Sequence, residues 1–147
     1  MPLLTGLELP PIEKLVPHRA PMFFIERVLE YTAESLSCSV APSRNEVCAH
    51  FGAKLPLAFG VEFMAQCAAV YAGIQAFGQG CAVQPGFLMS ARNVEILADC
   101  FPVNEELLVQ VKLAQTTETA SRFDCALYSG HTRSCLMRAT LGIFHGS

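Results

Sequence analysis

The sequence predicts an α+β fold in which one antiparallel sheet curls around a single long, buried helix. Two observations lead to this prediction. The stretch from Leu55 to Phe77 is apolar or small on nearly every side, and no proline interrupts it after Pro56, which is typical of a helix enclosed by other elements. Extended segments bounded by turn signals lie on both sides of this stretch, and such segments are typical of strands.

Before the helix, the chain is expected to form a helical turn, extended segments and a turn. PPIEKLVPHRAP predicts a short helical turn that ends at Pro17 and Pro21. MFFIERVLEYTAESLSCSVAP is rich in aromatic, aliphatic and β-branched residues, and predicts a long strand or a hairpin ending at Pro42. SRNE predicts a turn, and VCAHF another short extended piece.

The helix is expected to run for about five or six turns and to stop at Gly78 and Gly80. Four extended segments follow, with Ser129–Gly130 as a hairpin signal between the last two. They are GFLMSARNVEILA, EELLVQVKLAQTTETA, SRFDCALYSG and HTRSCLMRATLGIF. Because no repeat or linker is present, one domain over residues 1–147 is expected.

Charge and composition argue against several classes of protein. The formal net charge is −3 and the ten Lys and Arg residues are scattered, so nucleic acid is not an expected partner. The seven cysteines are an odd number without a CxxC pair, and most lie in apolar runs, where reduced thiols behave as small apolar groups. No signal peptide is apparent. We therefore expect a cytoplasmic protein.

The apolar stretch is long enough to cross a bilayer. Its Glu62, Gln66 and Gln75 side chains, and the strand-like segments around it, argue against insertion. We expect a helix covered by a sheet and no membrane span.

Glu62 is the carboxylate inside this stretch, and Gln66 follows four residues later on the same helix face. Burying an unpaired carboxylate costs free energy, so Glu62 has two possible explanations: a functional role in the protein interior, or a simpler structural one. In the simpler role, Glu62 faces water near the positive end of the helix dipole. The neighbouring Phe59 and Phe63 make that position less favourable. The helix pattern alone leaves both interpretations open.

Histidine is the side chain best suited to acid–base work near neutral pH. His50 lies upstream of the helix, before a Phe-Gly pair, where a lone His is more often structural than catalytic. His18 is its rival, in the stiff PHRAP segment. His131, in the predicted hairpin turn, and His145, in the tail, are expected to be solvated.

Several site types lack their signature. There is no HExxH motif, no paired Cys and no ligand spacing of His with carboxylates, so neither a metal nor another cofactor is expected. A phosphate-binding loop and a GxSxG nucleophile motif are also absent. Cys67 lies in the apolar helix, where packing is a better explanation than nucleophilic chemistry.

Three separate stretches resemble the dehydratases that act on 3-hydroxyacyl chains carried by acyl carrier protein. LVPHRAPMFFIERVLEY is similar to that family's amino-terminal motif, with Glu26 in place of the usual Asp, and HFGAKLPLAFGVEFMAQ is similar to its active-site segment. SARNVEILADCFPVNEELLVQVKL is similar to its Ala-Arg strand, with Asn104 and Glu105 in place of Gly-Asp. The likeness covers residues 10 to 145. It is nearest to a branch associated with bacterial aryl polyene synthesis.

The resemblance implies a hot-dog fold, an antiparallel sheet wrapped around one central helix, and the conversion of a 3-hydroxyacyl thioester into a trans-2-enoyl thioester. By resemblance, His50 takes the α-proton, and Glu62 positions or protonates the departing hydroxyl. Backbone N–H groups of Leu57 and Ala58, at the helix start, would hold the enolate-like oxygen. Supporting residues around the acyl tunnel are expected to be Gln66, Pro56, Phe59, Phe63, His18 and Arg19.

The active-site segment departs from the family pattern in one respect. Glu62 follows His50 by twelve residues, two fewer than the family usually has. Pro56 keeps the usual spacing to Glu62, so the shortening falls in the loop between His50 and Pro56. Leu57 stands where the family usually has Gly, but the group needed there is a backbone N–H.

The resemblance also implies partners. Family members are dimers in which His of one subunit meets the acidic residue of the other. We therefore expect an acyl carrier protein with a phosphopantetheine-linked substrate, and a homodimer or higher assembly, or a heterodimer with another hot-dog subunit. Two alternatives stay open: a non-catalytic hot-dog partner subunit of a dehydratase, and a hot-dog acyl thioesterase that uses a carboxylate and water.

Overall fold

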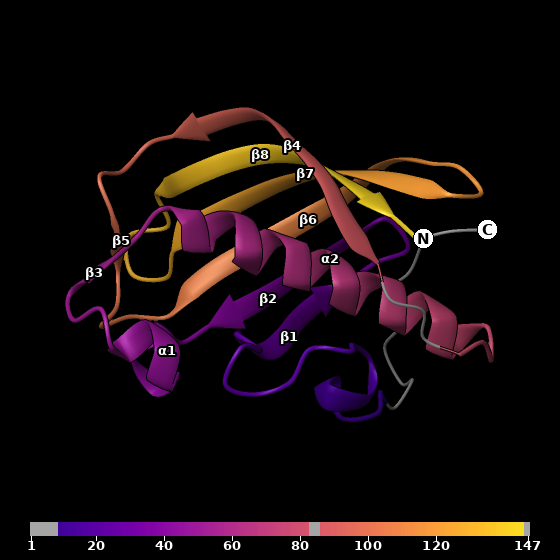
Figure 1. Cartoon of the computed structure of the whole chain (residues 1–147), viewed down its shortest axis with the longest axis horizontal. Coiled ribbons are helices and arrows are strands. Elements are labelled where there is room, and N and C mark those ends of the chain that lie inside the picture. The colour runs from indigo at the N-terminus through magenta and orange to yellow at the C-terminus, as the bar shows by residue number, and fades with distance from the viewer. Residues whose placement is uncertain (1–8, 83–85, 146–147) are drawn as a thin grey trace.

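The computed structural model describes residues 9–82 and 86–145. One long helix, α2 (Ala58–Gly78), lies across a curved antiparallel sheet that covers one side of it (Figure 1). The remaining elements are η1 (Ile12–Lys14), β1 (Ile25–Tyr31), β2 (Ser35–Val40), η2 (Pro42–Arg44), α1 (Glu46–Ala49), β3 (Lys54–Leu55), β4 (Phe87–Ile96), β5 (Phe101–Pro102), β6 (Leu107–Thr116), β7 (Ala120–Ser129) and β8 (Cys135–Phe144). The predicted α+β class, with a sheet around a central helix, is confirmed.

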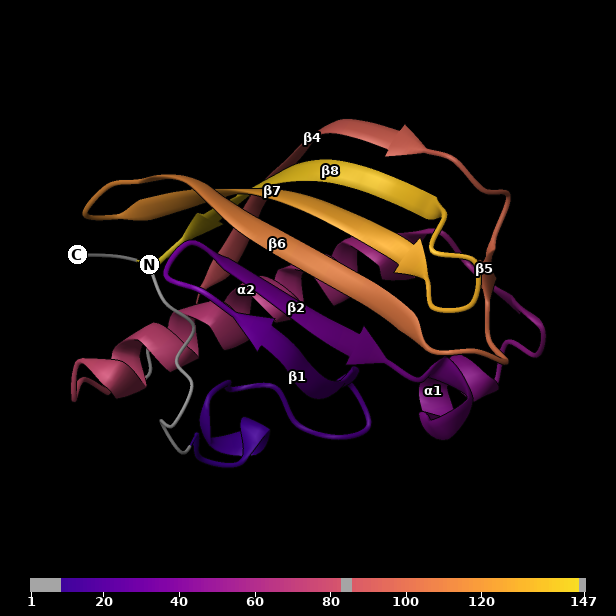
Figure 2. The ribbon, with the colours of Figure 1, turned by 180° about the vertical axis from the view of Figure 1, so that it is seen from behind.

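The large sheet has six strands in the order β1-β2-β6-β7-β8-β4. Seen from behind, the strands lie side by side in front of α2 (Figure 2). The predicted extended segments after the helix correspond to β4, β6, β7 and β8. The segment before Pro42 is a hairpin of β1 and β2, in which Tyr31 pairs with Leu36, so the hairpin alternative is the correct one.

The helix α2 packs on the sheet because its side chains supply the centre of the core. Phe63, Met64, Val70 and Ile74 are fully buried and pack in one cluster with residues of the sheet. This burial stabilises the fold by about 1.5–3 kcal/mol for each large apolar side chain. No helix in the described part of the chain is long and apolar enough to cross a membrane.

The segment before β1 packs directly on α2 at Gly73. A Cβ built on this glycine would lie 2.0 Å from the carbonyl oxygen of Leu15, so only glycine permits the contact. Leu15 is itself buried. The close approach places residues 15–24 beside the helix, where they form part of the site described below.

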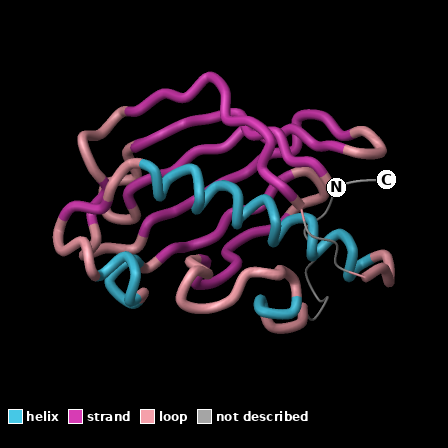
Figure 3. Tube along the Cα trace, in the orientation of Figure 1, coloured by secondary structure: helices cyan, strands magenta, loops and turns pink. Residues whose placement is uncertain are grey.

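The segment VCAHF is not extended, which corrects the prediction: its first three residues belong to α1, and His50 and Phe51 form the turn that follows. Asn45 caps α1, because its Oδ1 accepts hydrogen bonds from the N–H groups of Val47 and Cys48 at 2.9 and 3.0 Å. Local capping thus decides the conformation of a piece whose composition favours a strand. The two-residue pairing of β3 with β5 beside α1 (Figure 3) was not predicted.

Candidate active site

Gln66 holds the carboxyl group of Glu62 in place. Gln66 is fully buried, and its Nε2 donates to Glu62 Oε1 at 2.9 Å and to the carbonyl oxygen of Met22 at 2.7 Å. Its Oε1 accepts a hydrogen bond from the N–H of Phe24 at 2.8 Å. The same-face relation that the four-residue spacing predicted is therefore present, and it fixes the orientation of Glu62 from inside the protein.

A groove of about 980 Å³ runs along α2 and contains Glu62. Its floor follows the helix from Glu62 through a row of alanines to Gln75 and Gln79, a length of about 25 Å at the usual helical rise. Pro17 and His18 form part of the wall. The groove thus combines a half-buried carboxyl group with a long row of small side chains along the helix and further polar groups beyond them.

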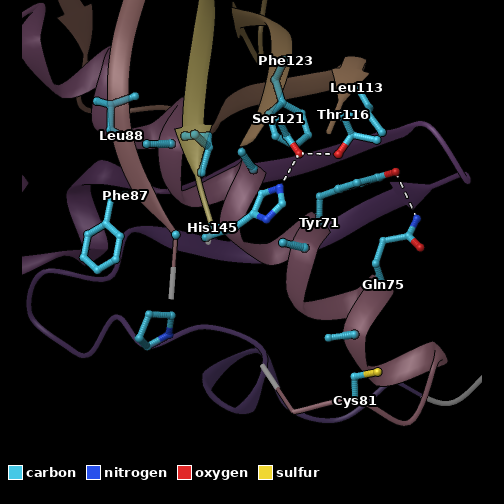
Figure 4. Close-up of a pocket in the computed structure, with 18 of the residues that line it drawn as sticks. Tyr71, Gln75, Cys81, Phe87, Leu88, Leu113, Thr116, Ser121, Phe123 and His145 are labelled. Carbon is cyan, nitrogen blue, oxygen red and sulfur yellow. Dashed lines mark hydrogen bonds between the residues drawn. The ribbon is translucent and has the colours of Figure 1, made fainter. Parts of the chain in front are cut away.

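The far end of the groove is polar (Figure 4). Ser121 Oγ lies 2.9 Å from Thr116 Oγ1 and 3.2 Å from His145 Nε2. His145 is half-buried, and its N–H donates to the carbonyl oxygen of Thr119 at 2.8 Å, which corrects the expectation of a solvated tail residue. These three side chains come from the ends of β6, β7 and β8, and no local sequence pattern connects them.

The start of α2 carries free backbone donors. The N–H groups of Phe59 and Gly60 bond to the carbonyl oxygens of Pro56 and Leu57 at 3.1 and 3.0 Å. No acceptor in the described part of the chain takes the N–H groups of Leu57 and Ala58, and no side chain caps this helix. Uncapped N–H groups at a helix start attract negative charge, as the sequence suggested for these two residues.

His50 lies outside this groove within the single chain. It is exposed, directly after α1, and its ring contacts that of Phe51 at a centroid distance of 6.0 Å. Phe51 in turn packs on Phe59 at 5.3 Å, which connects the His50 loop to the first turn of α2. Within one chain, therefore, the structure brings His18 into the groove of Glu62 but not His50.

The other residues predicted to support the tunnel do not line the groove. Phe59 and Phe63 form an aromatic cluster with Phe24, in which the ring centroids lie 5.5 to 6.1 Å apart. Pro56 is exposed. Arg19 is exposed as well, and its Nη1 donates to the carbonyl oxygens of Val16 and His18, both at 2.8 Å.

The buried thiols do not offer a nucleophile. Cys67 is fully buried, and burial, followed by the neighbouring thiols of Cys38 and Cys125, raises its pKa well above the usual range. Burial also raises the pKa of Cys48 to about 11. These thiols stay protonated at neutral pH. Among residues 9–82 and 86–145, no group of three or more metal-ligating side chains could hold an ion.

An antiparallel sheet wrapped around one central helix, with a groove along that helix, defines the hot-dog class of proteins. The family model for ApeP-like proteins, the ApeP dehydratase, matches residues 10–147. The chain therefore belongs to the ApeP-like dehydratase family of aryl polyene biosynthesis.

Solved structures share the fold. The dehydratase heterocomplex ApeI:P from Xenorhabdus doucetiae is similar, with a TM-score of 0.85 and 25% identity over 95% of this chain and 93% of that chain. Zebra fish thioesterase superfamily member 2 shares the fold at a TM-score of 0.62 and 12% identity, over 81% of this chain and 80% of that one. A hypothetical thioesterase from Streptococcus pneumoniae TIGR4, solved with coenzyme A, gives a TM-score of 0.58 and 10% identity over 80% of this chain and 83% of that chain. No curated protein matches the sequence.

Proposed function

We propose that the chain dehydrates 3-hydroxyacyl thioesters carried by acyl carrier protein to trans-2-enoyl thioesters. The observation that carries this proposal is the Glu62 carboxyl group, held by Gln66 and lining a long groove on the central helix. Membership of the ApeP-like dehydratase family supports the reaction class. The length of the groove fits an extended acyl chain that lies along α2.

Gln66 determines which oxygen of Glu62 is available for the substrate. Oε1 accepts the N–H of Gln66, so in the protonated acid the proton belongs on the other oxygen, Oε2. Glu62 can then give this proton to the 3-hydroxyl group. His50 takes the α-proton, the C2–C3 double bond forms, the C3–O bond breaks, and the hydroxyl leaves as water.

The thioester oxygen gains negative charge while the α-proton is removed. The free N–H groups of Leu57 and Ala58 at the positive end of α2 are suited to stabilise that charge. They lie about 7 Å along the helix axis before Glu62. This order gives the substrate a direction: its thioester lies at the helix start, and its chain runs toward Gln75.

His50 would reach the groove from a second subunit. The edge strand β4 is the surface we propose for pairing, because nearly all of its residues are exposed and several are apolar: Phe87 is 61% exposed, Met89 60% and Ile96 51%. An exposed, apolar edge strand is a template for another strand. The opposite edge, β1, instead carries the ion pair of Arg27 with Glu106.

Subunit pairing can be tested on the two edges. Met89→Glu places a charge on β4 and is expected to reduce the molar mass measured by light scattering to that of one chain. Leu29→Glu, on the other exposed edge, β1, is the matched control and should leave the assembly intact. The reverse result would assign the interface to β1.

The reaction can be tested with 3-hydroxyacyl carrier protein, followed by mass spectrometry of the intact acyl carrier protein. Loss of water with the thioester retained supports a dehydratase, whereas release of free thiol would indicate a thioesterase. Glu62→Gln and His50→Ala should each abolish dehydration. In a homodimer, mixing the two inactive variants should restore part of the activity. One site of each mixed dimer then receives His50 from the Glu62→Gln chain and Glu62 from the His50→Ala chain.

A non-catalytic partner subunit is the second candidate, favoured by the two departures of the active-site segment: the short loop between His50 and Pro56, and Leu57 in place of the usual Gly. In that case a complex with a catalytic hot-dog subunit would keep full activity when this chain carries Glu62→Gln or His50→Ala. The same complex would lose activity only when the catalytic subunit is changed.

A further inference from the structure

His18 lies in the groove of Glu62 with one ring nitrogen buried, and the proposed reaction gives it no role. Its Nδ1 is shielded from solvent and has no hydrogen-bond partner in the described part of the chain. The ring nevertheless lines the groove. The opposite ring edge, which carries Nε2, is therefore the one that a bound molecule can reach.

The position of the ring is fixed by the backbone on both sides. Before it, Leu15 packs against the bare backbone of Gly73. After it, the carbonyl oxygen of Met22 and the N–H of Phe24 bond to Gln66, the residue that also holds Glu62. One buried side chain thus sets the positions of the His18 segment and of the Glu62 carboxyl group.

The local loop adds a second constraint. Arg19 Nη1 donates to the carbonyl oxygens of Val16 and His18 at 2.8 Å each, and the N–H of Met22 donates to the carbonyl oxygen of Arg19 at 3.0 Å. A side chain on such a braced backbone is pre-organised, which is what a binding residue requires.

The unpartnered Nδ1 of His18 indicates which ring nitrogen carries the proton. A neutral imidazole carries its proton on one nitrogen only. An N–H group without an acceptor is rarer inside proteins than an unpaired acceptor, so the proton belongs on Nε2. His18 thus presents a hydrogen-bond donor to the groove.

We propose that His18 Nε2–H binds the 3-hydroxyl oxygen of the acyl substrate. This inference rests on the proposed function. The acyl part of a 3-hydroxyacyl thioester has two oxygens, and the carbonyl oxygen is assigned to the N–H groups at the helix start. The remaining acceptor is the hydroxyl oxygen, whose two lone pairs can take one hydrogen bond from His18 and one from Glu62. Two donors on the leaving oxygen also favour its departure as water.

Two substitutions separate the ring nitrogens. His18→Gln places an amide N–H near the position of Nε2, whereas His18→Asn places it near Nδ1. Binding is measured with the full chain, in the assembly that it forms, using 3-hydroxyacyl-pantetheine amide, whose α-proton is too weakly acidic for turnover. The comparison ligand is the saturated acyl-pantetheine amide of equal length. His131, exposed in the β7–β8 turn, provides the matched control His131→Asn.

His18→Asn is expected to raise the Kd of the hydroxylated ligand about tenfold, which corresponds to about 1.4 kcal/mol. His18→Gln should recover most of this loss, and neither should change the Kd of the saturated ligand. Equal affinities of the Asn and Gln variants, or equal losses for both ligands, would overturn the proposal. Binding is measured without turnover, so the two proposals can fail separately. If the wild-type protein does not dehydrate its substrate, the proposed reaction is disproved, but the binding test of His18 can still be carried out.

A measurement on the wild-type protein covers the case in which either variant fails to fold. Long-range ¹H–¹⁵N spectra should show His18 as the Nε2–H tautomer, and its Nε2 signal should shift on addition of the hydroxylated ligand but not of the saturated one. An Nδ1–H tautomer, or the same shift with both ligands, would disprove the assignment.

Discussion

Gln66→Leu is the substitution that most directly tests how the site is built. Leucine has a similar size and a good helix propensity, so the change removes hydrogen bonds with little change in packing. Three are lost: those from Nε2 to Glu62 and to Met22, and the one that Oε1 accepts from Phe24. The Glu62 carboxyl group becomes free to rotate, whereas the two backbone groups stay beside a buried apolar side chain.

The cost of this substitution follows from those two backbone groups. A buried donor without a partner costs about 1–3 kcal/mol, so the Phe24 N–H, whose bond to Gln66 is buried, should lower the free energy of unfolding by about that amount. The bond to the Met22 carbonyl oxygen is only partly buried, so water can replace it and its loss adds less. At about 2–4 °C per kcal/mol for a chain of this size, Tm should fall by roughly 2–12 °C. A typical domain is stable by about 5–15 kcal/mol, so the variant should still fold at low temperature.

Urea unfolding and thermal unfolding measure this effect, and dehydration assays on the folded variant measure kcat. Gln75→Leu is the matched control. Gln75 lies on the same helix, is only partly buried, and donates to the Ala33 carbonyl oxygen and to the Tyr71 hydroxyl at 3.1 and 3.0 Å without touching Glu62. Gln66→Leu should lower both stability and kcat. Gln75→Leu should lower stability by about 1 kcal/mol and, because Gln75 lines the distal part of the groove, should change KM but not kcat. Equal effects on kcat would refute the role assigned to Gln66.

Three further outcomes are expected. Gly73→Ala drives a Cβ into a backbone carbonyl oxygen and should destabilise the fold by about 2 kcal/mol or more. In the control Gly78→Ala, the added Cβ meets nothing within 4 Å, so this variant should be neutral or slightly stabilised. Urea unfolding measures both. Leu57 has φ −63°, which suits proline, so Leu57→Pro should remove one N–H and lower kcat about 10²-fold or more. Leu57→Ala keeps the N–H and should keep kcat. Equal kcat values for the Pro and Ala variants would exclude this donor. Cys48 is buried and its pKa is raised to about 11, so it should resist iodoacetamide in the native protein until the pH rises toward that value. The exposed Cys81 should be modified before Cys48, and peptide mass spectrometry detects both modifications.

The fold could be predicted from the sequence because its main determinant is a one-dimensional pattern. The uninterrupted apolar stretch ends in glycines and gives α2 within three residues of its observed start. The strands follow because turn residues separate them. The exception, α1, depends on one Asn side chain that caps two N–H groups, and a single local hydrogen-bonding residue is easily outweighed by composition when the sequence is examined alone.

The site was only partly predictable, because it depends on contacts between distant residues. The pairing of Glu62 with Gln66 follows from helical spacing, but the bonds of Gln66 to Met22 and Phe24 join residues more than forty positions apart. The access of His18 to the groove depends on the close contact at Gly73, and the Thr116–Ser121–His145 network depends on where three strands end. None of these leaves a periodic signal.

The strand β4 connects subunit pairing with the choice of substrate. Phe87 and Leu88 lie at the start of this edge strand and also line the groove (Figure 4). A second subunit that pairs along β4 would therefore press on the wall that encloses the distal part of the acyl chain. Exchanging one partner for another would then alter the accepted chain length without any change in Glu62, so the assembly itself would act as the molecular ruler.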